Sequence, residues 1–438
     1  MKTKNRVIAL AEIAVVLCSV FLVALPVIAT DKTTQKVSTS EVTTASEDEY
    51  VLGIYGNANE DDTIDMRDVT YTKLVIFGKK PETELADAYY DDEVDVLDEV
   101  QIKLIILGRE SELTLIDSAD RIVTVKKPVE GIVSFSGDTC EVLRALNAAD
   151  IVAGVVGYLK DDEAFFPELS KLPSVGSWSE PDVEMIISLN PDIVLPYGMS
   201  PSPEKLEDKL EGTGITVVRF YFYKPFAEPI SEEITKLGYI LGRREEAVEF
   251  NDFHEDVMDQ IEERTEELSE DEKPRVYIES SYKDFKTYSE GSGTHDMVVA
   301  AGGKNIAADL EGSYPTVEPE WVLREDPDMI IKTSSAKYGS GMGYCHEDPS
   351  VPQSYIDDMI AGRTGWDELT AVINGDVYLL DTDICGSPGY FAGVAYMAKW
   401  FHPGLFSDLD PEAIYKEYLE RFQGLDYCGI FGYPPPGS

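Results

Sequence analysis

"DVEMIISLNPDIVL" (residues 182–195) returns later in the chain as "EPEWVLREDPDMII" (residues 318–331). The second stretch begins 136 residues after the first and aligns Glu320 with Glu184. Each stretch has apolar residues at helical spacing, then a Pro-Asp pair and a short apolar run. This pattern indicates a helix followed by a buried strand. The repeat therefore predicts two similar α/β lobes.

The segments around each copy also alternate between strand and helix patterns. "EGIVSFSG" (130–137) is rich in β-branched residues and precedes the helical stretch "TCEVLRALNA" (139–148), for which Asp138 and Glu141 form a predicted capping box. "PRVYIESS" (274–281) begins a second series of the same kind. Strands that alternate with helices are typical of βαβ units with parallel sheets.

The stretch between the two series is helical. Residues 228–268 contain no proline after Pro229 and keep helical spacing, which predicts one or two long helices with a break near Gly242. The predicted divisions are an N-lobe at 120–225, bridging helices at 226–270 and a C-lobe at 274–436. Such a body has a natural ligand site where the loops of its two sheets face each other.

Composition limits the function. The chain has 438 residues, of which 43% are apolar, so it is long enough to bury a large core. It carries 83 Asp and Glu against 37 Lys and Arg, a formal charge of -46. A surface this acidic repels a phosphate backbone, which argues against nucleic acid as a partner.

The first fifty residues differ from the rest. Residues 1–29 combine the basic start "MKTKNR" with an uncharged stretch from Ile13 to Ala29, the pattern of a signal peptide or an N-terminal anchor. Residues 30–50 are rich in Thr and Ser and read as a linker. We therefore expect export to the extracellular face of the membrane or the cell surface.

A second internal repeat precedes the lobes. "GNANEDDTIDMRDVTYTKLVIFGKK" (56–80) matches the segment thirty residues later, and in both copies oxygen-bearing side chains recur at loop positions 1, 5, 9 and 12. This spacing suits a loop that wraps a hard cation, and it predicts Ca²⁺. The alternative is that the acids are solvated helix caps. The predicted ligands are Asn57, Asn59, Asp61, Asp65 and Asp68 in the first loop and Asp87, Asp91, Asp95 and Asp98 in the second.

The duplicated loop-helix unit resembles the type I dockerin module over residues 56–109, within a predicted domain at 51–112. Two features depart from that pattern. Asp62 and Asp92 replace the usual Gly at loop position 6, and Tyr89 at position 3 of the second loop predicts a weaker second site. The resemblance implies a small all-α calcium-loop domain and a cohesin-bearing surface partner.

The main body resembles the solute-binding proteins of ABC importers for iron chelates and cobalamin, over roughly residues 120–425. The resemblance rests on the order of four motifs: "RIVTVKKPVEGIVSFSGDTCEVLRALNAADIVAGVVGY" (121–158), "LPSVGSWSEPDVEMIISLNPDIVL" (172–195), "AGGKNIAADL" (301–310) and "WDELTAVINGDVYLLD" (366–381). It implies the class III architecture, in which a long rigid helix joins two α/β lobes. It also implies that the partners are an ABC permease and its ATPase. In this family, one carboxylate per lobe docks on permease arginines, and the resemblance assigns this role to Glu184 and Glu320.

We expect the loops after the strands to bind the ligand. Aromatic rings with polar tips suit a bulky, partly planar chelate, and the Gly-rich "EGSGTH" (290–295) and "CGSPGYF" (385–391) offer N–H groups to an anionic one. A ferric siderophore is the first expectation, with corrinoid and haem as alternatives and iron bound only within a chelate. The expected contacts are Ser136, Tyr158, Trp178, Tyr197, Tyr221, Phe222 and Tyr223 in the N-lobe, and Tyr282, Tyr288, Ser292, Thr294, His295, Tyr338, Tyr390 and Phe391 in the C-lobe.

Other function classes have little support. The sequence lacks a GxSxG elbow, an HExxH helix and a Walker loop, so we predict no catalytic residue and no enzyme. Cys345 and His346 are adjacent, but no further ligand spacing completes a transition-metal site. A third interpretation makes the chain a calcium-dependent surface scaffold or enzyme component attached through its dockerin-like module. Spacing leaves open the pairing of Cys140, Cys345, Cys385 and Cys428.

Overall fold

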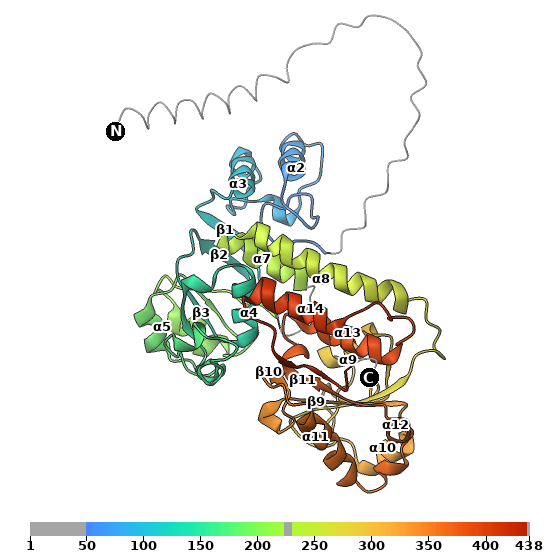
Figure 1. The fold of residues 1–438 in the computed structure, drawn as a ribbon. Helices are drawn as coiled ribbons and strands as arrows, with labels where there is room; N and C mark the ends of the chain where they lie inside the picture. The colour runs from blue at the N-terminus through green and yellow to red at the C-terminus, as the bar shows by residue number, and fades with distance from the viewer. Residues whose placement is uncertain (1–49, 223–229, 436–438) are drawn as a thin grey trace, which may run out of the picture. The chain divides into compact units, whose positions relative to one another are not determined.

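The computed structural model describes residues 50–222 and 230–435 (Figure 1). These residues lie in one compact unit that begins at Asp48. The predicted leader, all but the last residue of the predicted linker, and Tyr223 lie outside the described residues. Among the residues that the structure describes, no helix is both long and apolar enough to cross a membrane.

The N-lobe is built on a four-stranded parallel sheet. Its strand order is β4-β3-β5-β6. The strands are β3 (Ile132–Ser134), β4 (Val152–Val155), β5 (Ile193–Leu195) and β6 (Thr216–Val217), and the lobe's helices are α4 (Gly137–Ala145), α5 (Val183–Leu189) and α6 (Glu207–Leu210).

The C-lobe repeats this order with one additional strand. Its sheet runs β13-β11-β9-β7-β8, and only β13 is antiparallel to its neighbour. In both lobes the second strand along the chain pairs with one edge of the first strand. The third strand pairs with the opposite edge of the first, and the fourth pairs with the third. The strands are β7 (Arg275–Glu279), β8 (Lys304–Asn305), β9 (Met329–Ser334), β11 (Val377–Asp381) and β13 (Gly432–Tyr433). The prediction of two similar α/β lobes is confirmed.

The repeated sequence forms the same local structure twice. Helices α5 and α10 (Pro319–Glu325) each have seven residues, and β5 and β9 follow at the same offset of 136. Both helices end on a left-handed residue, Asn190 with φ 48° and Asp326 with φ 43°. Asn and Asp tolerate this conformation better than most residues, and it turns the chain back toward the sheet.

An aspartate after each of these helices ties two strands together. Asp192 accepts a hydrogen bond on Oδ2 from the backbone N of Gly131, at 2.9 Å, just before β3. Asp328 accepts the equivalent bond on Oδ2 from the backbone N of Arg275, at 2.8 Å, at the start of β7. The Pro-Asp pair of the repeat therefore fixes where neighbouring strands begin.

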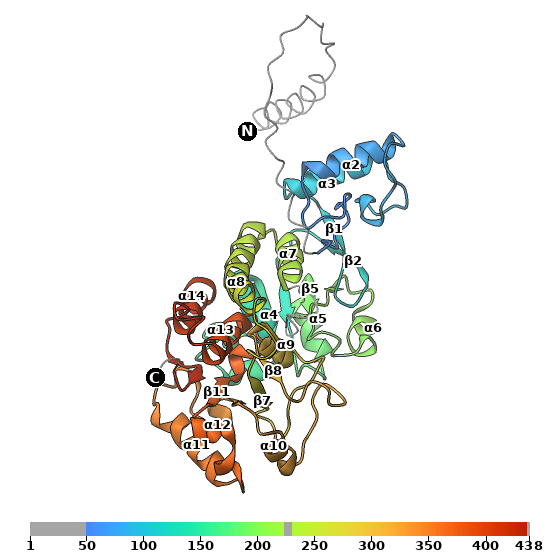
Figure 2. The same ribbon diagram turned by 90° about the vertical axis from the view of Figure 1, so that its right-hand side faces the viewer.

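Two helices, α7 (Ile230–Leu241) and α8 (Arg244–Thr265), join the lobes. They separate at Gly242, whose φ of +67° favours glycine, so the predicted break is confirmed. Figures 1 and 2 both show them side by side. Helix α8 buries residues at helical spacing, including Phe250, Phe253, Val257 and Ile261.

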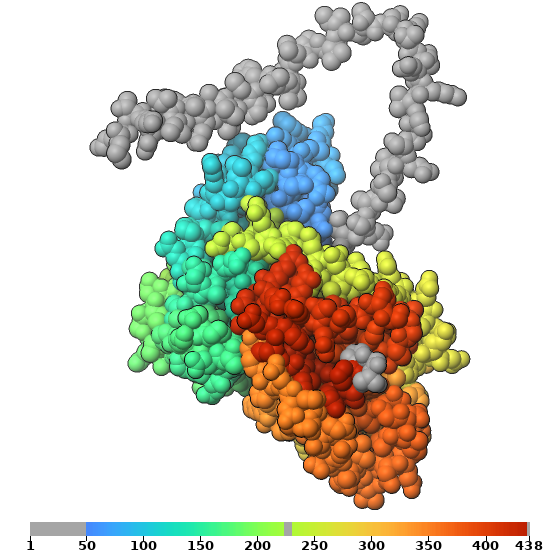
Figure 3. Space-filling view, viewed as in Figure 1, coloured from blue at the N-terminus to red at the C-terminus, as the bar shows by residue number. Residues whose placement is uncertain are grey.

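The apolar side of α8 packs on α13 (Tyr390–Phe401). Figure 3 shows the C-terminal segment, in red, lying against α8. The remaining C-lobe elements are β10 (Gly343–Tyr344), β12 (Gly429–Ile430), α9 (Gly293–Ala300), α11 (Ser350–Ala361), α12 (Thr370–Asn374), α14 (Pro411–Glu417) and the π-helix η9 (Tyr418–Gln423). Strands β10 and β12 pair antiparallel, and a disulfide joins Cys345 to Cys428 beside them.

The thirty-residue repeat also forms one structure twice. Helices α2 (Met66–Ile76) and α3 (Val96–Ile106) begin at equivalent positions, each after an aspartate N-cap, and they pack on each other. A Gly with φ +62° follows each helix, at Gly78 and Gly108. We call residues 50–109 the N-terminal module.

The N-terminal module is joined to the N-lobe by an antiparallel hairpin, β1 (Glu112–Ile116) and β2 (Ile122–Lys126). The β-branched stretch "RIVTV" (121–125) supplies most of β2, and it pairs in this hairpin and not in the lobe sheet. The module also contacts α7: the backbone N of Ile64 donates to the Tyr239 hydroxyl at 3.3 Å. Apolar residues of the module share one continuous core with the lobes.

The predicted capping box of α4 is wrong. The helix begins at Gly137, and Ser136 is its N-cap, with Oγ accepting a hydrogen bond from the backbone N of Thr139 at 3.1 Å. Asp138 therefore lies inside the first turn and is free of a capping role. Glu141 accepts a hydrogen bond on Oε2 from the Tyr418 hydroxyl at 2.5 Å instead.

Candidate functional site

The predicted N-lobe contacts follow the carboxyl ends of its strands, where parallel sheets bind ligands. Ser136 follows β3, Tyr158 follows β4 and Tyr197 follows β5. The Tyr158 hydroxyl accepts a hydrogen bond from the backbone N of Gly137 at 2.8 Å, which holds the ring beside the start of α4. Half of Tyr158 remains exposed, whereas Ser136 is buried and occupied as the N-cap.

A second aromatic pair lies in the same lobe. Trp178 is 48% exposed, and its ring packs edge-on against Tyr197 with 6.2 Å between centroids. Phe222 is buried and stacks on Phe220, so it belongs to the core. Tyr221 is partly buried.

The predicted C-lobe contacts divide into two groups. Tyr282 is 75% exposed and packs edge-on against Tyr338 at 5.7 Å, so this pair presents aromatic surface after β7 and β9. Tyr288 is buried, and its hydroxyl shares a hydrogen bond with Thr333 Oγ1 at 3.2 Å. The Tyr282–Tyr338 pair therefore suits ligand contact, whereas Tyr288 is part of the interior of the lobe.

The five other predicted contacts of this lobe are a helix cap, a hydrogen-bonded side chain or buried residues. Ser292 is the N-cap of α9, Thr294 is buried, and His295 Nδ1 lies 3.1 Å from Asn305 Nδ2. Tyr390 and Phe391 begin α13 and are 2% and 0% exposed. Phe391 packs among aromatic rings of α8 and η9, so it forms core and offers no surface to a ligand.

The two lobes meet along these strand ends. The ring of Phe165, in the N-lobe, packs edge-on against Tyr344 of the C-lobe at 5.4 Å. Glu141 on α4 is bonded to Tyr418 of η9, and Gln423 Nε2 donates to the Glu141 carbonyl at 3.2 Å. Helix α4 of the N-lobe therefore lies against η9 of the C-lobe.

Sequence reasoning missed the acids at this boundary. We call four of them the interlobe carboxylates: Asp138 and Asp162 from the N-lobe, and Asp381 and Asp383 from the C-lobe. Burial, then the charge of Asp383, raises the pKa of Asp138 to about 7. Desolvation, then the charge of Asp162, raises the pKa of Asp383 to about 6.

Two further groups complete this boundary. Burial and the charge of Asp383 raise the pKa of Asp381. Burial, with the charges of Asp381 and Asp383, also raises the pKa of the Cys385 thiol, so the thiol stays neutral. In the sequence, the only signal was the short acidic run "DTD" (381–383), which resembles many surface turns in an acidic chain.

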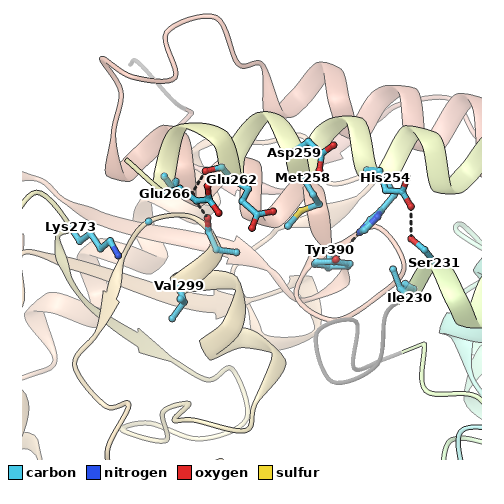
Figure 4. Close-up of a pocket in the computed structure, with 14 residues that line it drawn as sticks. Ile230, Ser231, His254, Met258, Asp259, Glu262, Glu266, Lys273, Val299 and Tyr390 are labelled. Carbon is cyan, nitrogen blue, oxygen red and sulfur yellow. Dashed lines mark hydrogen bonds between the residues drawn. The ribbon is translucent and has the colours of Figure 1, made fainter. Parts of the chain in front are cut away.

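A separate cavity of about 510 Å³ lies between α8 and α9 (Figure 4). At one end His254 Nε2 and the Tyr390 hydroxyl share a hydrogen bond of 2.7 Å. Burial lowers the pKa of His254 to about 4, so this imidazole is neutral at physiological pH. Of the predicted ligand contacts, Tyr390 alone is among the described residues that line this cavity.

The two glutamates predicted to dock on a permease are both exposed. Glu184 lies in the first turn of α5 and Glu320 in the first turn of α10, at equivalent places in the two lobes. Among the described residues, neither side chain forms an ion pair within 4.0 Å. Both carboxylates are therefore free to meet a partner's cation.

The first predicted calcium loop is compact. Asn57 and Asp68 are 0% exposed and Asp61 is 4% exposed. Asp68 accepts hydrogen bonds from the backbone N of Asn59 and Asp65, and burial raises its pKa to about 6. Asn59 Oδ1 is buried without a hydrogen-bond partner among the described residues. An oxygen-rich loop with such an orphaned oxygen fits a hard cation.

Other contacts already engage these acids. Asp65 and Asp95 cap helices α2 and α3, and Arg67 pairs with Asp61 at 3.0 Å. In the second loop Asp91 is exposed, and Tyr89 turns its side chain to solvent. Within residues 50–222 and 230–435, no three His, Cys, Asp or Glu side chains are arranged to hold a metal ion. Calcium in these loops therefore stays a prediction.

The disulfide answers the open question of cysteine pairing. Cys345 and Cys428 are bonded to each other, while Cys140 and Cys385 are free thiols. Cys345 is thus unavailable as a metal ligand, and the exposed His346 lies at 3.0 Å, through Nδ1, from the Tyr344 carbonyl oxygen.

Two matched α/β lobes, joined by helices and with exposed aromatic side chains after their strands, are typical of a ligand-binding protein. A model of the periplasmic binding protein family matches residues 132–384, more than half of the chain. The chain belongs to this family, and its fold is α/β with parallel sheets, similar to class III.

Individual relatives agree with this assignment. The chain is 28% identical over 298 residues to the uncharacterized ABC transporter substrate-binding lipoprotein YvrC of Bacillus subtilis, covering 67% of this chain and 86% of that one. It is 26% identical over 203 residues to the vitamin B12-binding protein of Yersinia pestis, covering 46% and 69%. The solved TroA-like periplasmic binding protein FepB from Veillonella parvula superposes with a TM-score of 0.65 at 26% identity, covering 73% and 98%.

Burial of Glu141 predicts a pH-dependent stability. Its folded-state pKa is about 8, above the ordinary value of 4.5, because burial outweighs the Tyr418 hydrogen bond and the charge of Arg144. The folded state therefore holds a proton that the unfolded chain releases, and stability falls as pH rises from about 4.5 to 8. We expect Glu141→Gln to match the parent Tm at pH 4.5 and to exceed it by a few degrees at pH 8.5.

Thermal unfolding followed by circular dichroism at both pH values measures this effect. Glu130→Gln is the control, because Glu130 is exposed. An equal difference between Glu141→Gln and the parent protein at pH 4.5 and 8.5 would contradict the buried, protonated carboxyl.

Proposed function

We propose that the protein is the extracytoplasmic substrate-binding protein of an ABC importer and that it captures a metal chelate, with a ferric siderophore as the first candidate. The supporting observation is the aromatic surface at the strand ends of both lobes. Tyr158 and Trp178 are about half exposed in the N-lobe, and Tyr282 is 75% exposed in the C-lobe. Such rings suit a bulky chelate, and corrinoid and haem remain alternatives.

The visible spectrum of the protein after desalting tests which ligand it binds. The full chain is incubated with a ferric siderophore, cyanocobalamin or haemin, then desalted and examined by visible spectroscopy and native mass spectrometry. We expect one equivalent of one coloured ligand to remain bound, because the lobes offer one shared boundary. Retention of none of the three would sink the chelate proposal.

Delivery to the permease is assigned to Glu184 and Glu320. Each carboxylate is exposed in the first turn of an equivalent helix, one per lobe. Two separated carboxylates that meet arginine forks supply both orientation and charge-assisted hydrogen bonds. The repeat aligns the two glutamates at the same place in "VEMI" (183–186) and "PEWV" (319–322).

We expect Glu184→Ala combined with Glu320→Ala to keep ligand affinity within about twofold and to abolish stimulation of the permease ATPase. The change removes only the docking charges, about 2 to 5 kcal/mol of association for each desolvated pair. ATPase assays with the reconstituted importer measure the loss, and Asp208→Ala with Asp367→Ala serves as an exposed acidic control. Normal stimulation by the glutamate variant would remove the assignment.

A second candidate function is attachment to a cell-surface assembly through the N-terminal module. One observation favours it: the module exposes large apolar side chains on and after both helices. Their exposures are Met66 57%, Phe77 74%, Val96 59%, Leu97 47%, Val100 48% and Leu107 63%. Apolar side chains gathered in this way mark an interaction surface. A cohesin-bearing surface protein is the partner that the dockerin resemblance implies.

Calcium binding by the first loop is testable directly. We expect Ca²⁺ to bind the full chain and to raise its Tm, and we expect Asp61→Asn to weaken binding at least tenfold, because it removes one buried carboxylate from the loop. Isothermal titration with CaCl₂ after chelator treatment gives the affinity. Glu82→Gln, an exposed acid of the same module, is the control. Absence of any Ca²⁺ heat at millimolar concentration would contradict the calcium loops.

A further inference from the structure

The loop after β7 projects Tyr282 into solvent. We call residues 280–286 the Tyr282 loop. Tyr282 is 75% exposed, and the backbone N of Ser280 donates to the Lys286 carbonyl at 2.8 Å, which closes the loop. Within it, Phe285 has φ +59°. A bulky residue rarely adopts this left-handed conformation, which persists only where surrounding contacts hold it. The Tyr282 loop therefore depends on contacts from elsewhere in the C-lobe.

One arginine supplies such contacts from a distant segment. Arg363 follows α11, and its Nη2 donates to Asp284 Oδ1, within the Tyr282 loop, at 2.9 Å. The same guanidinium forms a fork on Glu279, the last residue of β7: Nη1 donates to Oε2 at 2.9 Å and Nη2 to Oε1 at 2.6 Å. Bidentate bonds of this kind fix orientation as well as distance. Arg363 therefore ties the loop to the end of its own strand.

The Arg363 guanidinium also packs on two aromatic rings. Its Cζ lies 4.6 Å from the ring centre of Phe285 and 4.3 Å from that of Trp366. Trp366 is 1% exposed, and the two rings meet edge-on with 6.2 Å between centroids. Because Phe285 carries the left-handed φ, the guanidinium stabilises the loop where its backbone is least favourable.

The charges around Arg363 are balanced. Lys332 Nζ donates to Glu279 Oε1 at 2.6 Å and lies 3.7 Å from Asp284 Oδ1, so two cations face two acids. The side chains of Glu279, Lys332 and Arg363 are 1%, 2% and 9% exposed, whereas that of Asp284 is 74% exposed. Loss of a buried partner is strongly destabilising, while loss of an exposed one costs little. Asp284 is therefore the member of this group that can be changed most mildly.

The Tyr282 loop is thus ordered by the fold itself. The backbone N of Ser281 donates to Thr333 Oγ1 at 3.0 Å, and the Tyr282 ring packs edge-on against Tyr338 with 5.7 Å between centroids. A ligand that has to order a loop as it binds loses affinity by that cost. A ligand that meets Tyr282 in this loop does not incur the cost, because Arg363 holds the loop beforehand.

We infer that Arg363 is a positioning residue for ligand binding: it fixes the Tyr282 loop in the orientation that the ligand meets. This inference rests on the proposed function and deepens it, because it names a side chain on which the affinity of the C-lobe half of the aromatic surface depends. Lysine does not serve this role, because one ammonium group does not span Glu279 and Asp284 while it packs on two rings.

Hydrogen exchange followed by mass spectrometry tests the order of the loop without any ligand. In the full chain, we expect Arg363→Lys and Asp284→Asn to speed exchange in the Tyr282 loop at least about fivefold and to leave β9 unchanged. Asp326→Asn is the matched control. Asp326 is also an exposed C-lobe aspartate that accepts hydrogen bonds from a distant residue, Thr370, and Asn190 occupies the equivalent position in the N-lobe. Parental exchange of the loop in both variants overturns the inference.

Binding of ferrichrome, cyanocobalamin and haemin measures the consequence for the ligand. For the probe that the parent protein retains, we expect Arg363→Lys to lower affinity about tenfold and Asp284→Asn about threefold, through faster dissociation at unchanged stoichiometry. Asp326→Asn should bind as the parent does. A role in stability alone would lower Tm and leave the affinity of the folded protein unchanged. Parental affinity in both loop variants overturns the inference and leaves the proposed function standing, whereas retention of no probe by the parent protein overturns both.

Discussion

One aromatic cluster fixes the bridging helix α8 on the C-lobe. Phe250 and Phe253 of α8 pack edge-on against Phe391 of α13, and Phe422 of η9 closes the group at about 5 Å from both. Each buried ring contributes about 1.5 to 3 kcal/mol by leaving water. Tyr418, beside this cluster, then reaches across to Glu141 of the N-lobe. Helix α4 of the N-lobe is therefore held against η9, which this packing fixes on α8.

Local pattern was enough to predict the lobes. The 136-residue repeat predicts a helix and then a strand twice, and the structure forms these elements at that offset. The reason is physical: helical spacing, the Pro-Asp pair and a short apolar run each act within a few residues. The role of Asp192 and Asp328 was not predicted, because each accepts from a residue more than fifty positions away.

The sequence of a loop does not show whether its aromatic side chains face solvent or the core. Tyr282 and Phe391 both follow strands of the C-lobe, yet one is 75% exposed and the other fully buried. Phe391 turns inward because α8 presents apolar rings at that place, a contact between segments about 140 residues apart. The predicted N-cap of α4 was wrong for a related reason. Ser136 and Asp138 are both good N-caps, and the path of β3 decides between them.

Acidic side chains show how one residue type takes different roles in this chain. Asp65 accepts a backbone N–H as a helix cap, and Asp117 is tied to Arg121, so the charge of each is satisfied within its own segment. Asp383 has a neighbouring acid on either side of the lobe boundary and no cation bonded to it among the described residues. A net charge of -46 hides this difference, since composition counts every carboxylate alike. What distinguishes Asp383 is its surroundings, in which desolvation and the charge of Asp162 from the other lobe raise its pKa.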